Sequence, residues 1–336
     1  MKFINVARAL ALTSVMAFST FASADTIKFK MATDTGAKGS PTGKALEHWA
    51  DLIKTKTAGT PDAIKIDIFY QDELGDQKEV FDLFMAGEVD MMLNWPLTSY
   101  DKRMGLRNMP YMFLSWEQAF DAYKAGGWLN KIYNEVHKDQ GLMFFGAWPE
   151  GFGGVATRGK HATTVEGAKG IKVRVPSSFP NPQTMQALGY QASAITWGEV
   201  YTSIQTGVVD GDAGNIIYWD YEYFRDVLTH YVRTKHVFVT GVLSMNADSW
   251  KKLNAKQQKV VAEAAQAVME KQFADARTLD QSYVDKAIKA GMTYIEPTDL
   301  EIKALAKAAR EKVWPQMEAE IGAELVKQVR DNAPQL

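Results

Sequence analysis

The chain has 336 residues, a length that predicts about two domains. Hydrophobic residues make up 46% and charged residues 23% of the sequence, which is typical of a globular protein and excludes a disordered chain or a multi-span membrane protein. The formal net charge of -2 argues against nucleic-acid binding, which requires a basic excess. Cysteine is absent, which excludes disulfides, thiol nucleophiles and cysteine-ligated metal centres.

Residues 1–24 have the three-part layout of a secretory signal peptide. A positively charged start precedes an apolar run at 9–18, and the small residues at 22–24 form a cleavage site. We therefore expect a periplasmic protein whose mature chain begins at about Asp25. The alternative is an uncleaved membrane anchor, which the short apolar run disfavours because a spanning helix needs about 20 apolar residues.

Strand and helix patterns alternate along the mature chain. The pattern predicts strands at 27–31, 64–68, 91–93, 141–145 and 171–175, and helices at 43–56 and 77–86. This alternation favours an α/β fold with largely parallel sheets. Because no Pro/Gly-rich linker divides the chain, two lobes would be joined by more than one crossing.

The segment 256–290 contains neither glycine nor proline. Asn254 and Gln257 have the spacing of a capping box at its start, and Gly291 ends it. One continuous helix would be roughly 50 Å long. Two shorter helices with a break at 276–280 are the alternative, and the sequence leaves both open.

Cofactor and metal signatures are incomplete. Residues 151–156 formally fit the G-x-G-x-x-G/A dinucleotide pattern, but the residues that follow are poor helix formers. The segment starting at Asp210 resembles a calcium loop but has Gly214 where an oxygen ligand is required. The five histidines show no i, i+3 or i+4 pairing. We therefore expect no cofactor and no metal.

Four collinear segments carry a resemblance to a known family. Residues 164–176 (TVEGAKGIKVRVP) match one of its signatures, and the other matching segments are 70–91, 199–211 and 246–253. In these segments the chain resembles the DctP-type solute receptors of TRAP (tripartite ATP-independent periplasmic) transporters. The resemblance implies a two-lobed periplasmic-binding-protein fold, type II-like, with several crossings between the lobes and a long helix that spans both. It also implies a receptor without catalytic activity that delivers a small organic acid to TRAP membrane subunits.

The resemblance also suggests how the chain is divided. We expect lobe I to comprise residues 25–148 and 237–275, and lobe II to comprise 149–236 and 276–336. The crossings would then fall near Trp148, near His236 and within the long helix.

Arg174 is the residue that the resemblance assigns to the ligand carboxylate. A planar guanidinium can hold a carboxylate through two parallel, charge-assisted hydrogen bonds, which lysine cannot copy. The resemblance implies that Asn215 bonds the same carboxylate, although this asparagine lies one residue later than in the family pattern. Trp197 would pack on the ligand.

The resemblance implies further candidates in the loops after the first and third strands, which match loops of the family: Thr33, Asp34, Asn94 and Trp95. Phe179, Tyr218 and Trp219 could add apolar walls. Core packing is the alternative for each aromatic residue taken singly. Relatives that bind certain sugar acids carry a second arginine, which is missing here at 152–154, and Arg158 lies just beyond that position. One arginine with several aromatic residues predicts a monocarboxylate ligand with an apolar, keto or aromatic body.

Two other functions remain open from the sequence. A periplasmic lyase or hydrolase on the same fold would use Asp212, Glu150 or Glu73 as acid or base. A receptor for an ABC importer is the second alternative, because it would share the fold.

Overall fold

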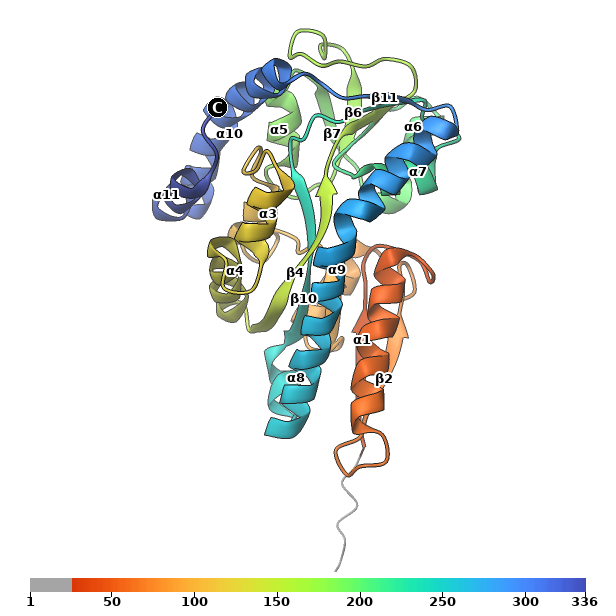
Figure 1. The fold of residues 1–336 in the computed structure, drawn as a ribbon, viewed down its shortest axis with the longest axis vertical. Coiled ribbons are helices and arrows are strands. Elements are labelled where there is room, and N and C mark those ends of the chain that lie inside the picture. The colour runs from red at the N-terminus through yellow and green to blue at the C-terminus, as the bar shows by residue number, and fades with distance from the viewer. Residues whose placement is uncertain (1–25) are drawn as a thin grey trace, which may run out of the picture.

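The structure is a computed structural model that describes residues 26–336 (Figure 1). The predicted signal peptide lies outside the described residues. None of the helices formed by residues 26–336 is long and apolar enough to cross a membrane. Two sheets, one above the other along the long axis of Figure 1, form two lobes with helices around them.

The first sheet has five strands in the order β2-β1-β3-β10-β4. Their bounds are β1 Ile27–Ala32, β2 Ile64–Phe69, β3 Met91–Asn94, β4 Leu142–Phe152 and β10 Phe238–Asn246. β1 pairs in parallel with β2 and β3, whereas β10 is antiparallel to both β3 and β4. The sheet is thus mixed rather than largely parallel, because two strands that cross between the lobes pair with each other at its edge.

The second sheet has six strands in the order β11-β9-β5-β8-β6-β7. Their bounds are β5 Val155–Thr157, β6 Lys172–Val175, β7 Gln191–Ala194, β8 Gly211–Ala213, β9 His230–Val232 and β11 Thr293–Ile295. β6 pairs in parallel with β7 and β8, and β5 is antiparallel to β8 and β9.

Shorter helices connect and cover the strands. Their bounds are α2 Gln77–Met85, α3 Trp116–Tyr123, α4 Trp128–Asp139, α5 Asn181–Ala187, α6 Val200–Gln205, α7 Ile217–Phe224 and α8 Ala247–Lys251, with the 3₁₀ helices η1 Lys102–Asn108 and η2 Trp197–Glu199.

Three segments connect the two sheets. β4 of the first sheet leads directly into β5 of the second, and β9 of the second sheet leads back into β10 of the first. The third connection is α9 (Ala255–Lys289), a single helix that extends along both lobes (Figure 1). The unbroken alternative for 256–290 is therefore the correct one.

The packing of α9 explains why it does not break. Asn254 caps it as predicted, accepting hydrogen bonds from the backbone N–H groups of Lys256 and Gln257. Near its start, Val261 is buried in the core that contains Trp49 of α1 (Pro41–Thr57). Near its end, Val284 is buried in a separate core of the second sheet. Each half thus buries its own apolar stripe, one in each lobe.

The C-terminal helices α10 (Asp299–Ile321) and α11 (Ala323–Asn332) also touch both cores. Ile302 and Leu305 pack in the core of the second sheet, whereas Val313 and Met317 pack in the core of the first. The assignment of all of 276–336 to lobe II stays a prediction. The packing of Val313 and Met317 against the first sheet does not favour it for the C-terminal part of this range.

Candidate ligand-binding site

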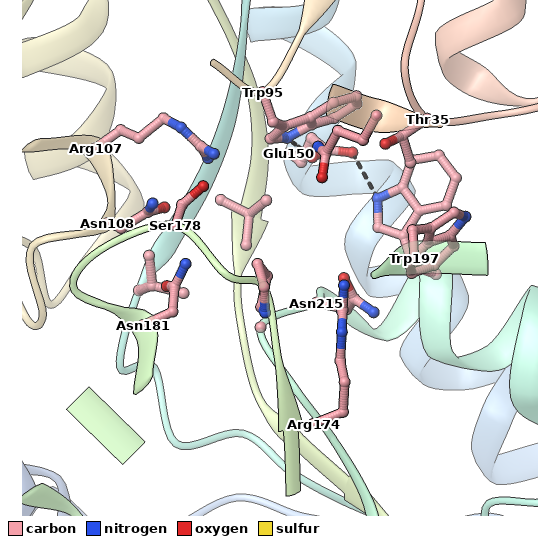
Figure 2. Close-up of a pocket in the computed structure, with 16 residues that line it drawn as sticks. Thr35, Trp95, Arg107, Asn108, Glu150, Arg174, Ser178, Asn181, Trp197 and Asn215 are labelled. Atoms are coloured by element: carbon pink, nitrogen blue, oxygen red, sulfur yellow. Dashed lines mark hydrogen bonds between the residues drawn. The ribbon is translucent and has the colours of Figure 1, made fainter. Parts of the chain in front are cut away.

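A cavity lies between the two sheets (Figure 2). Its polar lining residues come from both lobes, for example Gln77 and Arg107 from the first and Arg174 and Asn181 from the second. The lining residues are Thr35, Gln77, Trp95, Arg107, Asn108, Glu150, Arg174, Pro176, Ser178, Asn181, Trp197, Gly214, Asn215, Trp219, Val237 and Val239. Convergent polar groups and aromatic walls are typical of a small-molecule site.

Arg174 extends from β6 toward the cavity and is held in place by two hydrogen bonds. Its Nε donates to the carbonyl oxygen of Ile195 at 2.9 Å, and its Nη1 donates to Asp212 Oδ1 at 3.0 Å. The Trp197 ring centroid lies 5.8 Å from the guanidinium carbon, a cation–π contact. Nη2 has no partner among the described residues, so the end of the guanidinium is free to meet a carboxylate.

Asp212, Asn215 and Asp220 form a buried network behind Arg174. Asn215 Nδ2 donates to Asp212 Oδ2 at 2.7 Å and to Asp220 Oδ1 at 3.2 Å. Burial and the nearby Asp212 raise the pKa of Asp220 well above its usual range. Asn215 lines the cavity, but it would have to give up one of these hydrogen bonds to donate to a ligand.

Glu150 of β4 lies at the aromatic side of the cavity. Its Oε2 accepts a hydrogen bond from Trp95 Nε1 at 3.0 Å and its Oε1 accepts one from Trp219 Nε1 at 2.9 Å. Burial raises the pKa of Glu150 to about 8, and the two indole donors oppose this shift. The Trp219 ring packs edge-on against Trp95 and Trp197 at centroid distances of 6.2 and 5.9 Å. Glu150 thus fixes the orientation of two of the three tryptophans.

On the opposite side, Arg107 and Asn108 of η1 lie beside Ser178 and Asn181 (Figure 2). None of these four residues is among the site residues predicted from the sequence. A signal was present, because Arg107 and Asn108 interrupt an otherwise apolar run from Met104 to Phe113.

Five of the predicted site residues line the cavity: Arg174, Asn215, Trp197, Trp95 and Trp219. The loop residues Thr33, Asp34 and Asn94 do not. They are buried behind the cavity wall, where Asp34 Oδ2 accepts a hydrogen bond from Gln77 and Thr33 Oγ1 donates to the backbone of Thr35. Burial raises the pKa of Asp34 to about 7.

The other three predicted residues lie outside the cavity for different reasons. Tyr218 packs edge-on against Tyr283 of α9, with ring centroids 4.7 Å apart, and Phe179 packs against the core of the first sheet. Arg158 is exposed, and its Nη1 donates to the carbonyl oxygen of Ile204 at 3.1 Å, so it does not replace the missing second arginine.

The groups considered for acid or base chemistry are not arranged as a catalytic set. Glu73 is exposed, and its Oε2 accepts a hydrogen bond from the backbone N–H of Tyr70. Asp212 is paired with Arg174, and Glu150 holds two indoles. Among residues 26–336 no group of three or more metal-ligating side chains comes together.

Comparison with known families supports the fold. The family model for DctP, described as bacterial extracellular solute-binding protein, family 7, matches residues 31–320. A solute-binding protein from Chromohalobacter salexigens is 25% identical over 279 residues, covering 82% of this chain and 80% of that protein. The ectoine-binding periplasmic protein TeaA of Halomonas elongata is 27% identical over 216 residues, 63% of this chain and 62% of TeaA.

Solved structures share the architecture. A TRAP periplasmic solute-binding protein from Desulfovibrio salexigens with bound orotic acid superimposes with a TM-score of 0.82 at 21% identity, covering 91% of this chain and 98% of that one. The ectoine-binding protein of Halomonas elongata gives the same TM-score at 20% identity, covering 91% and 98% of the two chains. The family match over most of the chain and the two-lobed fold lead to one conclusion: the protein belongs to the DctP family of bacterial extracellular solute-binding proteins, the receptors of TRAP transporters.

Proposed function

We propose that this protein captures a small organic acid in the cavity between its lobes and delivers it to TRAP membrane subunits. The observation that carries the proposal is Arg174, whose guanidinium is oriented by Ile195 and Asp212 while Nη2 stays free at the cavity. Related structures contain D-glucuronate and succinate, both carboxylates, which supports a carboxylate ligand here.

The finer identity of the ligand stays a prediction. The sequence predicted a monocarboxylate ligand with an apolar, keto or aromatic body, because it indicated only one arginine in the cleft. The tryptophans on the cavity wall still suit such a body, but Arg107 is a second arginine at the cavity, so the count of arginines no longer supports that choice.

The location and the partners form part of the same proposal. Members of the DctP family act outside the cytoplasm, and we infer that residues 1–24 direct export and that the mature chain starts at about Asp25. N-terminal sequencing of protein from the periplasm would test this start. Enzyme activity is disfavoured because Glu150 and Asp212 are occupied by neighbouring side chains, and mass spectrometry showing a bound acid unchanged after incubation would support a receptor.

A thermal-shift screen of organic acids tests the proposed function. A ligand that binds only the folded protein at 100 times its Kd stabilises it by about 2.7 kcal/mol. We expect Arg174→Ala to weaken the binding of every acid that gives a shift by about 30-fold or more. Arg158→Ala, outside the cavity, is the control and should leave all shifts unchanged. An Arg174→Ala protein with wild-type affinity would contradict the proposal.

A further inference from the structure

Arg107 differs from the other buried arginines in having no partner. Three arginines among residues 26–336 are buried: Arg107, Arg174 and Arg233. Arg174 pairs with Asp212, and Arg233 pairs with Asp280. The guanidinium of Arg107 makes no ion pair or hydrogen bond with any described residue, although it is only 7% exposed, and its Nε is fully buried without an acceptor.

The nearest carboxyl groups do not fill this role. Asp34 Oδ2 accepts its hydrogen bond from Gln77, and both oxygens of Glu150 accept from tryptophan N–H groups. Neither carboxyl accepts a hydrogen bond from Arg107. A buried charge is retained at a cost unless another group pairs with it. We therefore expect the guanidinium of Arg107 to be paired by a hydrogen-bond acceptor from a bound ligand, because no described residue provides one.

Neighbouring side chains point to the same kind of group. The Nδ2 of Asn108 is buried and has no acceptor among the described residues. Ser178 and Asn181 face the same part of the cavity, so four polar side chains with N–H or O–H donors gather there (Figure 2). Arg174 lies at a different wall of the cavity and is already balanced by Asp212, whereas Arg107 is not.

Close packing holds this set in place. A Cβ added to Gly105 of η1 would lie 2.4 Å from the carbonyl oxygen of Phe179. The two backbones are thus in direct contact, which fixes η1, with Arg107 and Asn108, against the segment that carries Ser178 and Asn181. Fixed donors around an empty space are what a preorganised binding site requires.

Building on the proposed function, we propose that Arg107 and Asn108 form a second oxyanion subsite, which selects ligands with an acidic group in addition to the carboxylate held by Arg174. The ligand would be a small diacid or a related acid with two oxyanion groups at its ends. Ser178 and Asn181 would donate further hydrogen bonds to the second group.

Calorimetry with α,ω-dicarboxylates of three to six carbons, each paired with its mono-amide, tests this subsite. The mono-amide keeps one carboxylate and nearly the same shape but loses the second charge. We expect at least one diacid to bind about 30-fold or more tightly than its mono-amide. Arg107→Gln should remove this preference while changing the mono-amide affinity little. Arg103→Gln is the matched control, because Arg103 lies on the same η1 but pairs with Asp101 and Asp139 away from the cavity.

Stability separates a binding role from a structural one. Without ligand, Arg107→Met removes an unpaired buried charge and should leave the melting temperature unchanged or raise it. A lowered melting temperature with an unchanged diacid preference would show that Arg107 is structural and overturn the subsite. Asn108→Asp places a carboxylate beside Arg107 and should also abolish the preference for the diacid. If the Arg107 variants do not fold, this variant tests the subsite in their place.

The outcomes for the two proposals differ. Mono-amides that bind through Arg174 as tightly as every diacid would overturn the second subsite alone. No binding of any acid, or unchanged affinity in Arg174→Ala, would overturn the proposed function and the subsite with it.

Discussion

Arg174 and Asp212 face each other across two neighbouring parallel strands, β6 and β8, with Nη1 and Oδ1 3.0 Å apart. Both side chains are buried, 3% and 0% exposed. The pairing register places the acid directly beside the arginine, so the geometry of Arg174 is set by the sheet rather than by a flexible loop.

Asp212→Asn should destabilise the protein because it leaves the guanidinium of Arg174 buried without a countercharge. Removing one partner of a buried ion pair costs about 3–5 kcal/mol. Urea unfolding followed by circular dichroism measures this loss. Asp248→Asn, which removes an exposed partner of Lys251, is the control and should leave the unfolding midpoint unchanged. Equal stability of Asp212→Asn and wild type would contradict the importance of the pair.

Glu150 should make the protein less stable as the pH rises from about 4.5 to about 8. Its pKa is about 8 in the folded protein, against an ordinary value of 4.5, so in this range the folded state keeps a proton that the unfolded state has lost. The unfolding free energy therefore falls with pH, by at most about 1.4 kcal/mol per pH unit for one proton.

Glu150→Gln cannot titrate, so its unfolding free energy should fall less steeply between pH 5 and pH 8 than that of the wild type. Urea titrations at four pH values measure the two slopes. Glu73→Gln, at an exposed position, should keep the wild-type slope. Identical slopes for Glu150→Gln and the wild type would show that Glu150 does not carry the pH dependence.

Trp197→Ala should weaken ligand binding without a large loss of stability. The side chain is only partly buried, so its removal leaves no closed cavity, but the cation–π contact with Arg174 at 5.8 Å is lost. Such contacts contribute about 0.5–2 kcal/mol, so losing the one that orients Arg174 should weaken binding by at most roughly 30-fold. Calorimetry with the acid found in the screen measures the change. Trp197→Phe keeps an aromatic face and should recover most of the affinity, whereas equal loss in both variants would argue against the contact.

Gly105→Ala should displace η1 from the segment around Phe179, because the new Cβ would lie 2.4 Å from a backbone oxygen that cannot rotate away. We expect a lower melting temperature and weaker ligand binding, since Arg107 and Asn108 move with η1. Gly198→Ala is the matched control, because a Cβ there meets no atom within 4 Å. Unchanged binding by Gly105→Ala would show that the position of η1 does not matter for the ligand.

Local patterns were sufficient for most of the architecture. Alternating and helical apolar periods predicted β1, α1, β2, α2 and β3 to within a few residues. The capping box at Asn254 correctly marked the start of α9, because capping depends on residues only three positions apart. The family resemblance added the two-lobed fold, and it also pointed to Arg174, which lines the cavity.

Whether α9 is continuous could not be decided locally, because a helix of this length depends on what each half packs against. Its two halves are buried in different lobes, by residues distant in the sequence such as Trp49. The same limit applies to the mixed sheets, since the pairing of β10 with β4 joins segments about a hundred residues apart.

The sequence by itself determined most of the elements and the family, because these follow from short-range periodicity and from motifs that survive as linear segments. Only the tertiary structure decided which polar groups share the cavity. Glu150 meets Trp95 and Trp219 from 55 and 69 residues away, and Arg107 lines the same cavity as Ser178. Burial and the absence of a partner, which give these groups their chemical character, are properties of the packed chain and have no counterpart in the order of its residues.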